Sequence, residues 1–102
     1  MPDVVSLTLH APHSLADRLG DFLLDHEAMT SEFSTSDVRF HGSDLGSRSA
    51  SEQIQGHARQ VQVCVLISST EADRLLQELG QSFPACGISY WIGPVIKSGA
   101  IL

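Results

Sequence analysis

The 102-residue sequence predicts a single-domain α+β fold, a ferredoxin-like sandwich: a βαββαβ chain forms a four-stranded antiparallel sheet with both helices on one face. Two observations predict it. Apolar and polar residues alternate over 5–10, and valine or isoleucine stands at every second position over 60–67, which is typical of strands with one buried face. Each of these strands is followed by a helical pattern and then by another strand, and right-handed crossovers arrange two such βαβ units into this sheet.

The two βαβ units also resemble each other in sequence. Shifted by 56 positions, Val5 falls on Val61 and the alternating residues that follow keep their places. The same shift superimposes 14–19 on 70–75, and both segments read Ser/Thr-x-Ala-Asp-Arg-Leu. A duplicated unit accounts for both agreements. The alternative is that the same helix-start residues simply occur twice.

Both helices have recognisable starts. Ser14 and Thr70 are each followed three residues later by an aspartate, as in a capping box. The first helix is expected to run for about 13 residues and to end near His26, whose ring we expect to be bonded to a carbonyl. Gly20 lies inside this helix at a cost of about 1 kcal/mol relative to alanine, so we expect another backbone or a large side chain to approach it closely.

The remaining strands are expected at 33–40 and 88–92. Within 33–40 the apolar residues change parity, which predicts a β-bulge between Thr35 and Asp37. The side chains expected to face the helices and to dominate stability are Val5, Leu7, Leu9, Val61, Val63, Val65, Ile67, Ile88, Tyr90 and Ile92.

The other face of the sheet is too mixed for a core and too apolar for ordinary solvent-exposed surface. It is expected to carry Val4, Ser6, Thr8, Gln60, Gln62, Cys64, Leu66 and Trp91. We predict that this face forms a homo-oligomer interface through Gln62, Cys64, Leu66 and Trp91, with Trp91 as the anchor. The alternative is that the C-terminal tail, 94–102, covers Trp91.

Composition excludes several classes of function. The net charge is −6 with six Lys and Arg residues, and nucleic-acid binding requires clustered basic residues, so we expect no nucleic-acid partner. No apolar run approaches the roughly 18 residues that a membrane span needs, so no membrane insertion is expected. The start lacks the features of a signal peptide, and Cys64 and Cys86 form no disulfide framework, so we expect a cytoplasmic protein.

The long connection 41–57, between the second and third strands, is the segment where a function is expected. Loops of this length in a compact domain are usually functional or disordered. Ser49 and Glu52 have the spacing to cap a short helical turn that ends at Gly56. Three of the six basic residues lie in the loop or its stems, which makes an anionic ligand or partner credible: Arg39, Arg48 and Arg59. The alternative is a solvated loop whose arginines pair with acidic neighbours.

Histidine and cysteine residues raise the alternative of direct metal binding. His41 and His57 stand at the two ends of the loop, and pairing of the flanking strands would bring them close together. A closed zinc site needs four ligands, more than this part of one chain offers. Cys86, in a Pro-Ala-Cys-Gly turn, is the more reactive or soft-metal thiol of the two. The ligands of this hypothesis are therefore His41, His57 and Cys86, with a divalent ion.

The sequence lacks the motifs that mark common enzymes. It contains no G-x-S-x-G, no G-x-x-x-x-G-K-[ST] and no H-E-x-x-H pattern, so we expect no catalytic residues and no enzyme. The carboxylates lie mostly at solvent-facing helix positions. A small enzyme using the open sheet face remains a second alternative, but Cys64 is the titratable residue that the sequence places there.

The layout resembles a known group of proteins. A duplicated βαβ with a long loop between the second and third strands is similar to the PII-like signalling proteins and to the CutA-type divalent-ion tolerance proteins. The segment from Ser49 to Gly56, the stem His41-Gly42 and the ending from Tyr90 to Val95 resemble a proteobacterial family of unknown function. That family has a PII-like fold and is often encoded beside heavy-metal efflux pumps of the resistance-nodulation-division type.

The resemblance implies a regulatory or accessory module in metal-ion homeostasis or efflux. Its long loop would bind a ligand, a membrane transporter or another protein, and its chains would form a trimer whose sheets face inward. The loop residues that the resemblance points to are Gly42, Ser49, Glu52, Gln53 and Gly56, and Arg48 joins them as the basic residue within the loop. Adenine nucleotides rank below metal and protein ligands, because 82–87 lacks the basic residues with which PII proteins hold ATP and the C-terminal basic clamp is reduced to Lys97.

Overall fold

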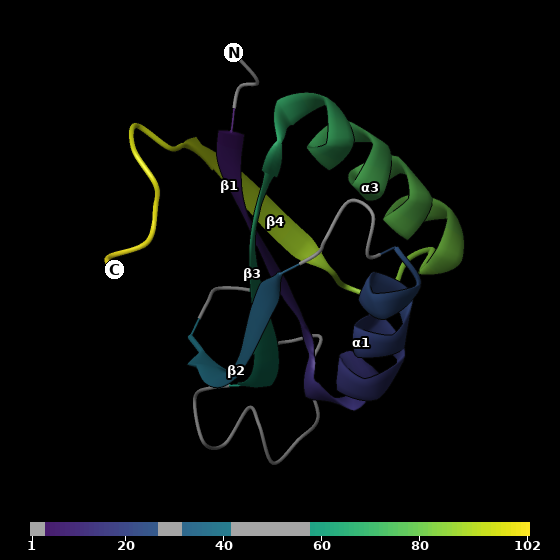
Figure 1. Ribbon diagram of the computed structural model, residues 1–102. Coiled ribbons are helices and arrows are strands. Elements are labelled where there is room, and N and C mark those ends of the chain that lie inside the picture. Colours follow the sequence, from purple (N-terminus) through teal and green to yellow (C-terminus); the bar gives the residue numbers. More distant parts are fainter. Residues whose placement is uncertain (1–3, 27–31, 42–57) are drawn as a thin grey trace.

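The computed structural model describes residues 4–26, 32–41 and 58–102. Its four strands form one antiparallel sheet in the order β2-β3-β1-β4, so the two central strands belong to different halves of the chain. Figure 1 shows both helices on the same side of this sheet. In chain order the elements are β1 (Val4–Pro12), a 3₁₀ turn (His13–Leu15), α1 (Ala16–Asp25), β2 (Phe33–Phe40), β3 (Ala58–Ser68), α3 (Ser69–Ser82) and β4 (Ser89–Pro94). The ferredoxin-like prediction is confirmed.

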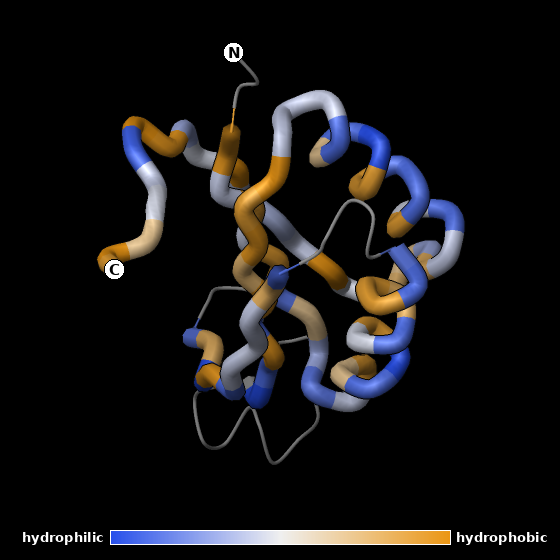
Figure 2. Tube along the Cα trace, viewed as in Figure 1, coloured by the Kyte–Doolittle hydropathy of each residue, from blue (hydrophilic) through white to orange (hydrophobic). Residues whose placement is uncertain are grey.

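The core lies between the two central strands and the helices. Alternate residues of β1 and β3 point toward α1 and α3, and most of them are buried together with the inner faces of the helices. The buried strand residues are Leu7, Leu9, Ala11, Val61, Val63, Val65 and Ile67. The hydropathy pattern follows this arrangement, with hydrophilic residues along the outer sides of both helices (Figure 2). The largest side chains with almost no exposed surface are Leu7, Leu9, Leu19, Leu23, Leu75 and Val63.

Positions related by the 56-residue shift play the same part in the core. Leu19 and Leu75 are both buried where α1 and α3 meet the sheet, and Leu23 and Leu79 follow one helical turn later. Equivalent burial of equivalent residues is what a duplicated βαβ unit requires. The internal repeat is therefore a repeat of core positions as well as of sequence.

The two helices cover the central strands and leave the edge strands half uncovered. On β4, Tyr90 and Ile92 point to the helix side as predicted, but they are 56% and 39% exposed and do not belong to the core. The prediction of burial was wrong for these two because period-two alternation gives the face of a strand, not its distance from a helix. Val5 and Ile88 are partly buried against the core.

The predicted bulge in β2 does not exist. β2 pairs with β3 residue by residue from Phe33 opposite Val65 to Phe40 opposite Ala58. Phe33 therefore faces the helices, whereas Val38 and Phe40 face the other side of the sheet. The prediction assumed that all apolar residues of the strand must share the helix side, and it failed because the open face also takes apolar side chains.

The helix starts differ from the predicted capping boxes. α1 is preceded by the 3₁₀ turn, and no side chain caps its first backbone N–H groups, so Ser14 is not a cap. At α3 the cap is Ser68 rather than Thr70, since the Ser68 hydroxyl accepts a hydrogen bond from the Glu71 N–H at 3.2 Å. The relevant Ser-x-x-Glu spacing begins two residues earlier than expected.

Removal of this cap is expected to destabilise the protein. We predict that Ser68→Ala lowers the free energy of unfolding by about 1 kcal/mol, because the Glu71 N–H loses its partner. Ser14→Ala is the matched control and should change stability by less than about 0.5 kcal/mol. Urea unfolding at one fixed protein concentration measures both values. Equal effects of the two substitutions would contradict the assignment of the cap.

Gly20 was expected beside a close neighbour, and this was wrong. A Cβ atom built on Gly20 meets nothing within 4 Å, and the same holds for Gly80 in α3. Gly20→Ala and Gly80→Ala are therefore each expected to raise the free energy of unfolding by about 0.5 to 1 kcal/mol, since alanine has the higher helix propensity. Thermal and urea unfolding would test this, and a loss of stability in either variant would contradict it.

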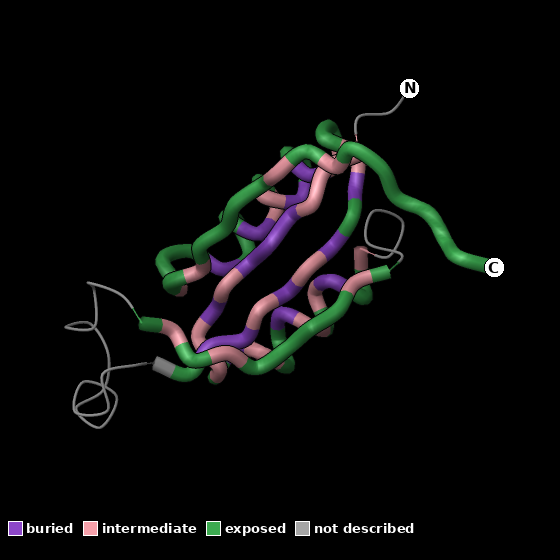
Figure 3. The backbone as a smooth tube through the Cα atoms, turned by 90° about the vertical axis from the view of Figure 1, so that its left-hand side faces the viewer, coloured by how far each residue is buried: buried purple, intermediate pink, exposed green. Residues whose placement is uncertain are grey.

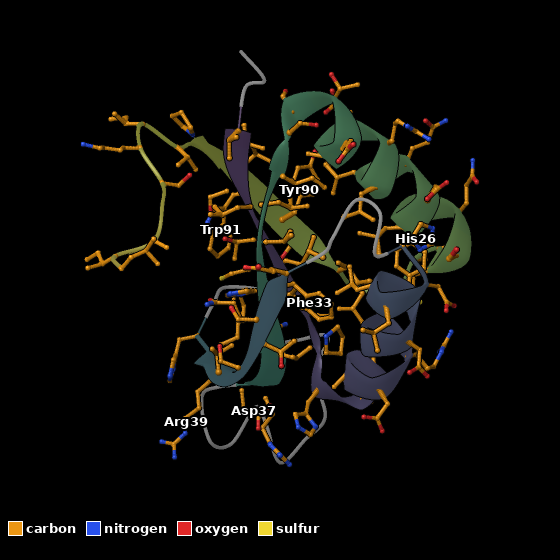
Figure 4. All side chains as sticks on the ribbon, viewed as in Figure 1. His26, Phe33, Asp37, Arg39, Tyr90 and Trp91 are labelled. Carbon is orange, nitrogen blue, oxygen red and sulfur yellow. The ribbon has the colours of Figure 1, made fainter. Side chains whose placement is uncertain are left out.

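His26 ends α1 as predicted. Its Nδ1 lies 2.7 Å from the Phe22 carbonyl oxygen, and its ring stacks on Phe22 with centroids 4.2 Å apart. Its Nε2 lies 2.7 Å from Glu78 Oε2 on α3, so the side chain also joins the two helices. Figure 4 shows His26 in this position between them.

The C-terminal tail leaves the body of the protein after β4. The Val95 N–H still bonds to the Val4 carbonyl at 3.3 Å, but Ile96, Ile101 and Leu102 are fully exposed. Figures 1 and 3 show the tail extending away from the sheet. The alternative in which the tail covers Trp91 is therefore wrong for a single chain.

Candidate functional site

Figure 3 looks onto the face of the sheet that the helices leave uncovered. The register of the four strands defines its members, among which there is no Asp, Glu, Lys or Arg on the described strands. In a chain with 18% charged residues, a whole sheet face without one is unusual for a solvated surface. This open face consists of Val4, Ser6, Thr8, His10, Pro12, Ser34, Ser36, Val38, Phe40, Gln60, Gln62, Cys64, Leu66, Ser68, Ser89, Trp91 and Gly93.

Large apolar side chains are exposed on the open face. Leu66 and Trp91 are 54% and 53% exposed, and they lie on β3 and β4. Figure 4 shows Trp91 leaving β4 on the side opposite to Tyr90. All four residues of the predicted interface are therefore on this face, where Gln62 and Cys64 are half-buried and precede Leu66 on the same face of β3.

A cluster of polar and aromatic side chains occupies the middle of the open face. His10 Nε2 lies 2.8 Å from Gln62 Oε1, and Gln62 Nε2 donates to the Cys64 sulfur at 3.6 Å. The Trp91 ring meets the His10 ring edge-on at 4.8 Å, and the Phe40 ring does so at 6.4 Å from the other side. His10 is thus half-buried between two aromatic rings and held by one amide.

The open face also has a shallow hollow of about 450 Å³. Ser6, Ser34, Cys64 and Leu66 line it from three strands, and Glu32, just before β2, borders it. The hollow is wide and open, and Glu32 is the charged residue among those that line it. It is a depression in a broad surface and lacks the enclosure of a small-molecule pocket.

The stems of the long loop bring basic residues together on the helix side of the sheet. Arg39 and Arg59 are direct cross-strand partners, and like charges in such positions are unfavourable. Arg59 Nη2 lies 3.4 Å from His13 Nε2, which in turn lies 3.5 Å from Asp37 Oδ1. Asp37 and Arg39 extend from the same end of β2 (Figure 4).

The loop residues themselves lie outside the described part of the chain. This holds for Gly42, Arg48, Ser49, Glu52, Gln53, Gly56 and His57. His41 is described and is exposed directly after β2. The predicted ligand loop and the predicted pairing of His41 with His57 are therefore neither confirmed nor contradicted.

The predicted metal residues are not gathered into a site by the described residues. Cys86 lies half-buried in the turn before β4, where its thiol donates to the Pro84 carbonyl at 3.5 Å. His41 follows β2, at the opposite edge of the sheet. Within 4–26, 32–41 and 58–102, no three His, Cys, Asp or Glu side chains are grouped so that they could hold a metal ion. Both cysteines carry free thiols.

The helix side has a second hollow, between α1 and β2. Asp17, Asp21 and Asp37 line it together with Leu24 and Phe33, and its volume is about 630 Å³. This hollow exists because α1 covers β1 and β3 but does not reach over the edge strand β2. The described residues lining it include three carboxylates and no basic side chain.

Comparison with known proteins places the chain in a family. The family model described as "Protein of unknown function (DUF3240)" matches residues 1–102. The chain belongs to the DUF3240 family. A search of curated proteins finds no match. In the described part of this DUF3240 protein, no helix has the length and apolar character to cross a membrane.

Solved structures share the fold of this DUF3240 protein. A DUF3240 family protein from Shewanella baltica OS155 matches with a TM-score of 0.76 at 20% identity, covering 100% of both chains. CPII, a nitrogen regulatory PII-like protein from Thiomonas intermedia K12 bound to ADP, AMP and bicarbonate, matches with 0.68 at 13% identity over 96% of each chain. CutA from Synechococcus elongatus PCC7942 matches with 0.66 at 15%, covering 94% of this chain and 80% of CutA. The predicted relation to PII-like and CutA proteins is confirmed at the level of the fold.

Sequence reasoning missed two members of the central cluster. His10 and Phe40 both point to the open face, and neither was assigned to it from sequence. A signal for His10 was present, because it continues the even-numbered series of Ser6 and Thr8. Phe40 was missed because the predicted bulge, which β2 lacks, would have turned its side chain to the helix side. Gln60, expected on this face, is there but only 3% exposed.

Proposed function

We propose that this DUF3240 protein is a PII-like regulatory or accessory binding module that acts as a homo-oligomer and catalyses no reaction. The observation that carries the proposal is the open face. It combines exposed Leu66 and Trp91 with a complete lack of charged side chains on the described strands. The fold shared with a PII-like regulatory protein and with CutA supports the same class of function.

Self-association explains the composition of this face. Interface centres are depleted of charged residues and enriched in aromatic ones, and tryptophan is a frequent anchor. A solvated face would gain solubility from charges, and charged residues are abundant elsewhere on this chain. A second copy is the partner that brings an equally uncharged surface. The resemblance to PII-like proteins makes a trimer the expected stoichiometry.

The long loop is the proposed contact with a ligand or partner. It connects β2 and β3 beside Arg39 and Arg59, so the assembled protein would present several loops flanked by basic stems. We propose that its role belongs to metal-ion homeostasis or efflux in the cytoplasm and that its partner is a protein such as a transporter. The free thiols of Cys64 and Cys86 suit a reducing compartment.

A thermal-shift panel tests the binding half of this proposal. Purified protein is heated with copper, zinc, nickel and cobalt ions, ATP, ADP, AMP and cyclic nucleotides. A ligand at 100 times its dissociation constant adds about 2.7 kcal/mol to stability, an easily measured shift. We expect any stabilising ligand to lose its effect in Arg48→Ala and Glu52→Ala, while Asp73→Ala on α3 serves as a control outside the loop.

Further measurements with the ligands of this panel separate the proposal from its alternatives. Strong metal heats in calorimetry that vanish in His41→Ala and His57→Ala would replace it with direct metal binding. A stabilising ligand that is converted into a product would replace it with an enzyme. A ligand whose effect survives all loop substitutions would contradict the role given to the loop.

A further inference from the structure

We infer that His10 makes self-association across the open face depend on pH, so that the assembly forms when His10 is neutral and opens when it takes up a proton. This inference rests on the proposed self-association and adds its regulation. The inference rests on one observation: His10 is the one imidazole on this face of the described strands, which carry no charged side chain there, and it lies in the middle of the face against Trp91.

The position of His10 makes it part of any contact across this face. It lies on β1, a central strand, directly opposite Gln62 on β3 and Ser89 on β4. Its ring touches that of Trp91, whose centroid is 4.8 Å away. A second copy that covers Trp91 must therefore come close to His10 as well. Covering the face removes water from the imidazole.

Neutral His10 suits such an environment. The 2.8 Å contact with Gln62 Oε1 places a proton on Nε2, and the Gln62 amide is itself oriented by the Cys64 sulfur. The Nε2–H of His10 and the Oε1 of Gln62 then satisfy each other within the chain. The rings of Trp91 and Phe40, each at a steep angle to the imidazole, complete the surroundings on both sides. Nothing in this arrangement requires a charge.

Protonated His10 does not suit it. The groups that face it are Gln62 and Cys64 from β3, Ser89 and Trp91 from β4 and Phe40 from β2, and on the described strands none of these is a carboxylate. Glu32, which lines the hollow, directly precedes β2 and so stands at the end of that strand opposite to Phe40. Asp37 lies on the helix side. An imidazolium would be buried at the contact without a counter-charge, which is costly.

The direction of the pH effect follows from linkage. Separate chains keep His10 in contact with water and bind the proton more readily than assembled chains do. Association is therefore fully favourable at a pH where histidine is neutral and weakens as the pH falls. Histidine is the side chain type whose charge ordinarily changes between about pH 5 and 8, so this is the range in which the inference is tested.

Sedimentation equilibrium of the full chain at about pH 8 and about pH 5.5 tests the inference. We expect the dissociation constant of the wild type to rise by at least about tenfold at the lower pH. His10→Gln, which keeps a neutral hydrogen-bonding side chain, should show no such change whatever its affinity at pH 8. His13→Gln and His26→Gln should keep the pH dependence of the wild type.

A second readout reports His10 directly. Trp91 is the one tryptophan of the chain, and a protonated imidazole in contact with an indole quenches its fluorescence. The emission of the wild type should fall over the same pH range as the assembly, and that of His10→Gln should not. Far-UV circular dichroism at both pH values confirms that every variant is folded.

The outcomes are distinguishable. A protein that is monomeric at pH 8 would overturn the proposed self-association together with this inference. An assembly that is equally tight at both pH values would overturn the inference alone and leave the proposed function standing. Equal pH dependence in the wild type and His10→Gln would likewise overturn it, because the proton would then act elsewhere.

Discussion

Leu7→Ala is expected to lower the free energy of unfolding by about 2 to 5 kcal/mol, the range for a leucine removed from a packed core. Leu7 is fully buried on the central strand β1, where its cross-strand partners are Val65 and Ile92. The loss comes from the transfer of the missing methyl groups and from the cavity left beneath the two helices. Domains of this size have a total stability of about 5 to 15 kcal/mol, so the variant should be severely destabilised.

Leu24→Ala is the matched control for this experiment. Leu24 lies on α1 and is 60% exposed, so the same substitution should change stability by less than about 0.5 kcal/mol. Urea unfolding must be followed at one protein concentration, because association of the chains adds to the apparent stability. Similar losses in the two variants would contradict the assignment of the core.

Leu66→Glu is expected to abolish self-association while the chain stays folded. Leu66 is 54% exposed in the single chain, so a glutamate there remains hydrated. In the assembly, that carboxylate would be buried on a face without a basic partner on the described strands. An unpaired buried charge costs several kcal/mol, and about 3 kcal/mol corresponds to a dissociation constant raised about a hundredfold.

Leu24→Glu makes the same chemical change on the helix side. Its exposure in the single chain is similar, at 60%, so it controls for added charge and for lost apolar surface. Sedimentation velocity should show the assembled species for Leu24→Glu and single chains for Leu66→Glu. If the assembly dissociated in both variants, or only in Leu24→Glu, the contact between chains would not lie on the open face.

The sequence was sufficient to predict the sheet and most of the core. Strict alternation gave the face of the residues of β1 and β3, and the repeated βαβ unit gave the antiparallel sheet with both helices on one side. Burial failed at Tyr90 and Ile92, because distance from a covering helix depends on packing in three dimensions. The cap at Ser68 was missed because Thr70 offered a similar pattern two residues later.

The sequence was sufficient to predict which face of the sheet carries the candidate site, but not the side-chain contacts at its centre. The open face was recognised from the even-numbered residues of β1 and β3 and from Trp91. Its central contacts join three strands, His10 with Gln62 and Trp91, and such cross-strand neighbours follow only from the register. The assumption that apolar residues must face the helices hid Phe40 and produced the bulge that β2 lacks.

The mass of the full chain in solution tests the central claim most directly. Light scattering on the eluted peak of a size-exclusion column, at micromolar concentration and about pH 8, gives this mass without any substitution. A self-associating open face predicts a multiple of the 11.0 kDa chain, with three copies expected. A mass of one chain over the whole micromolar range would contradict the account.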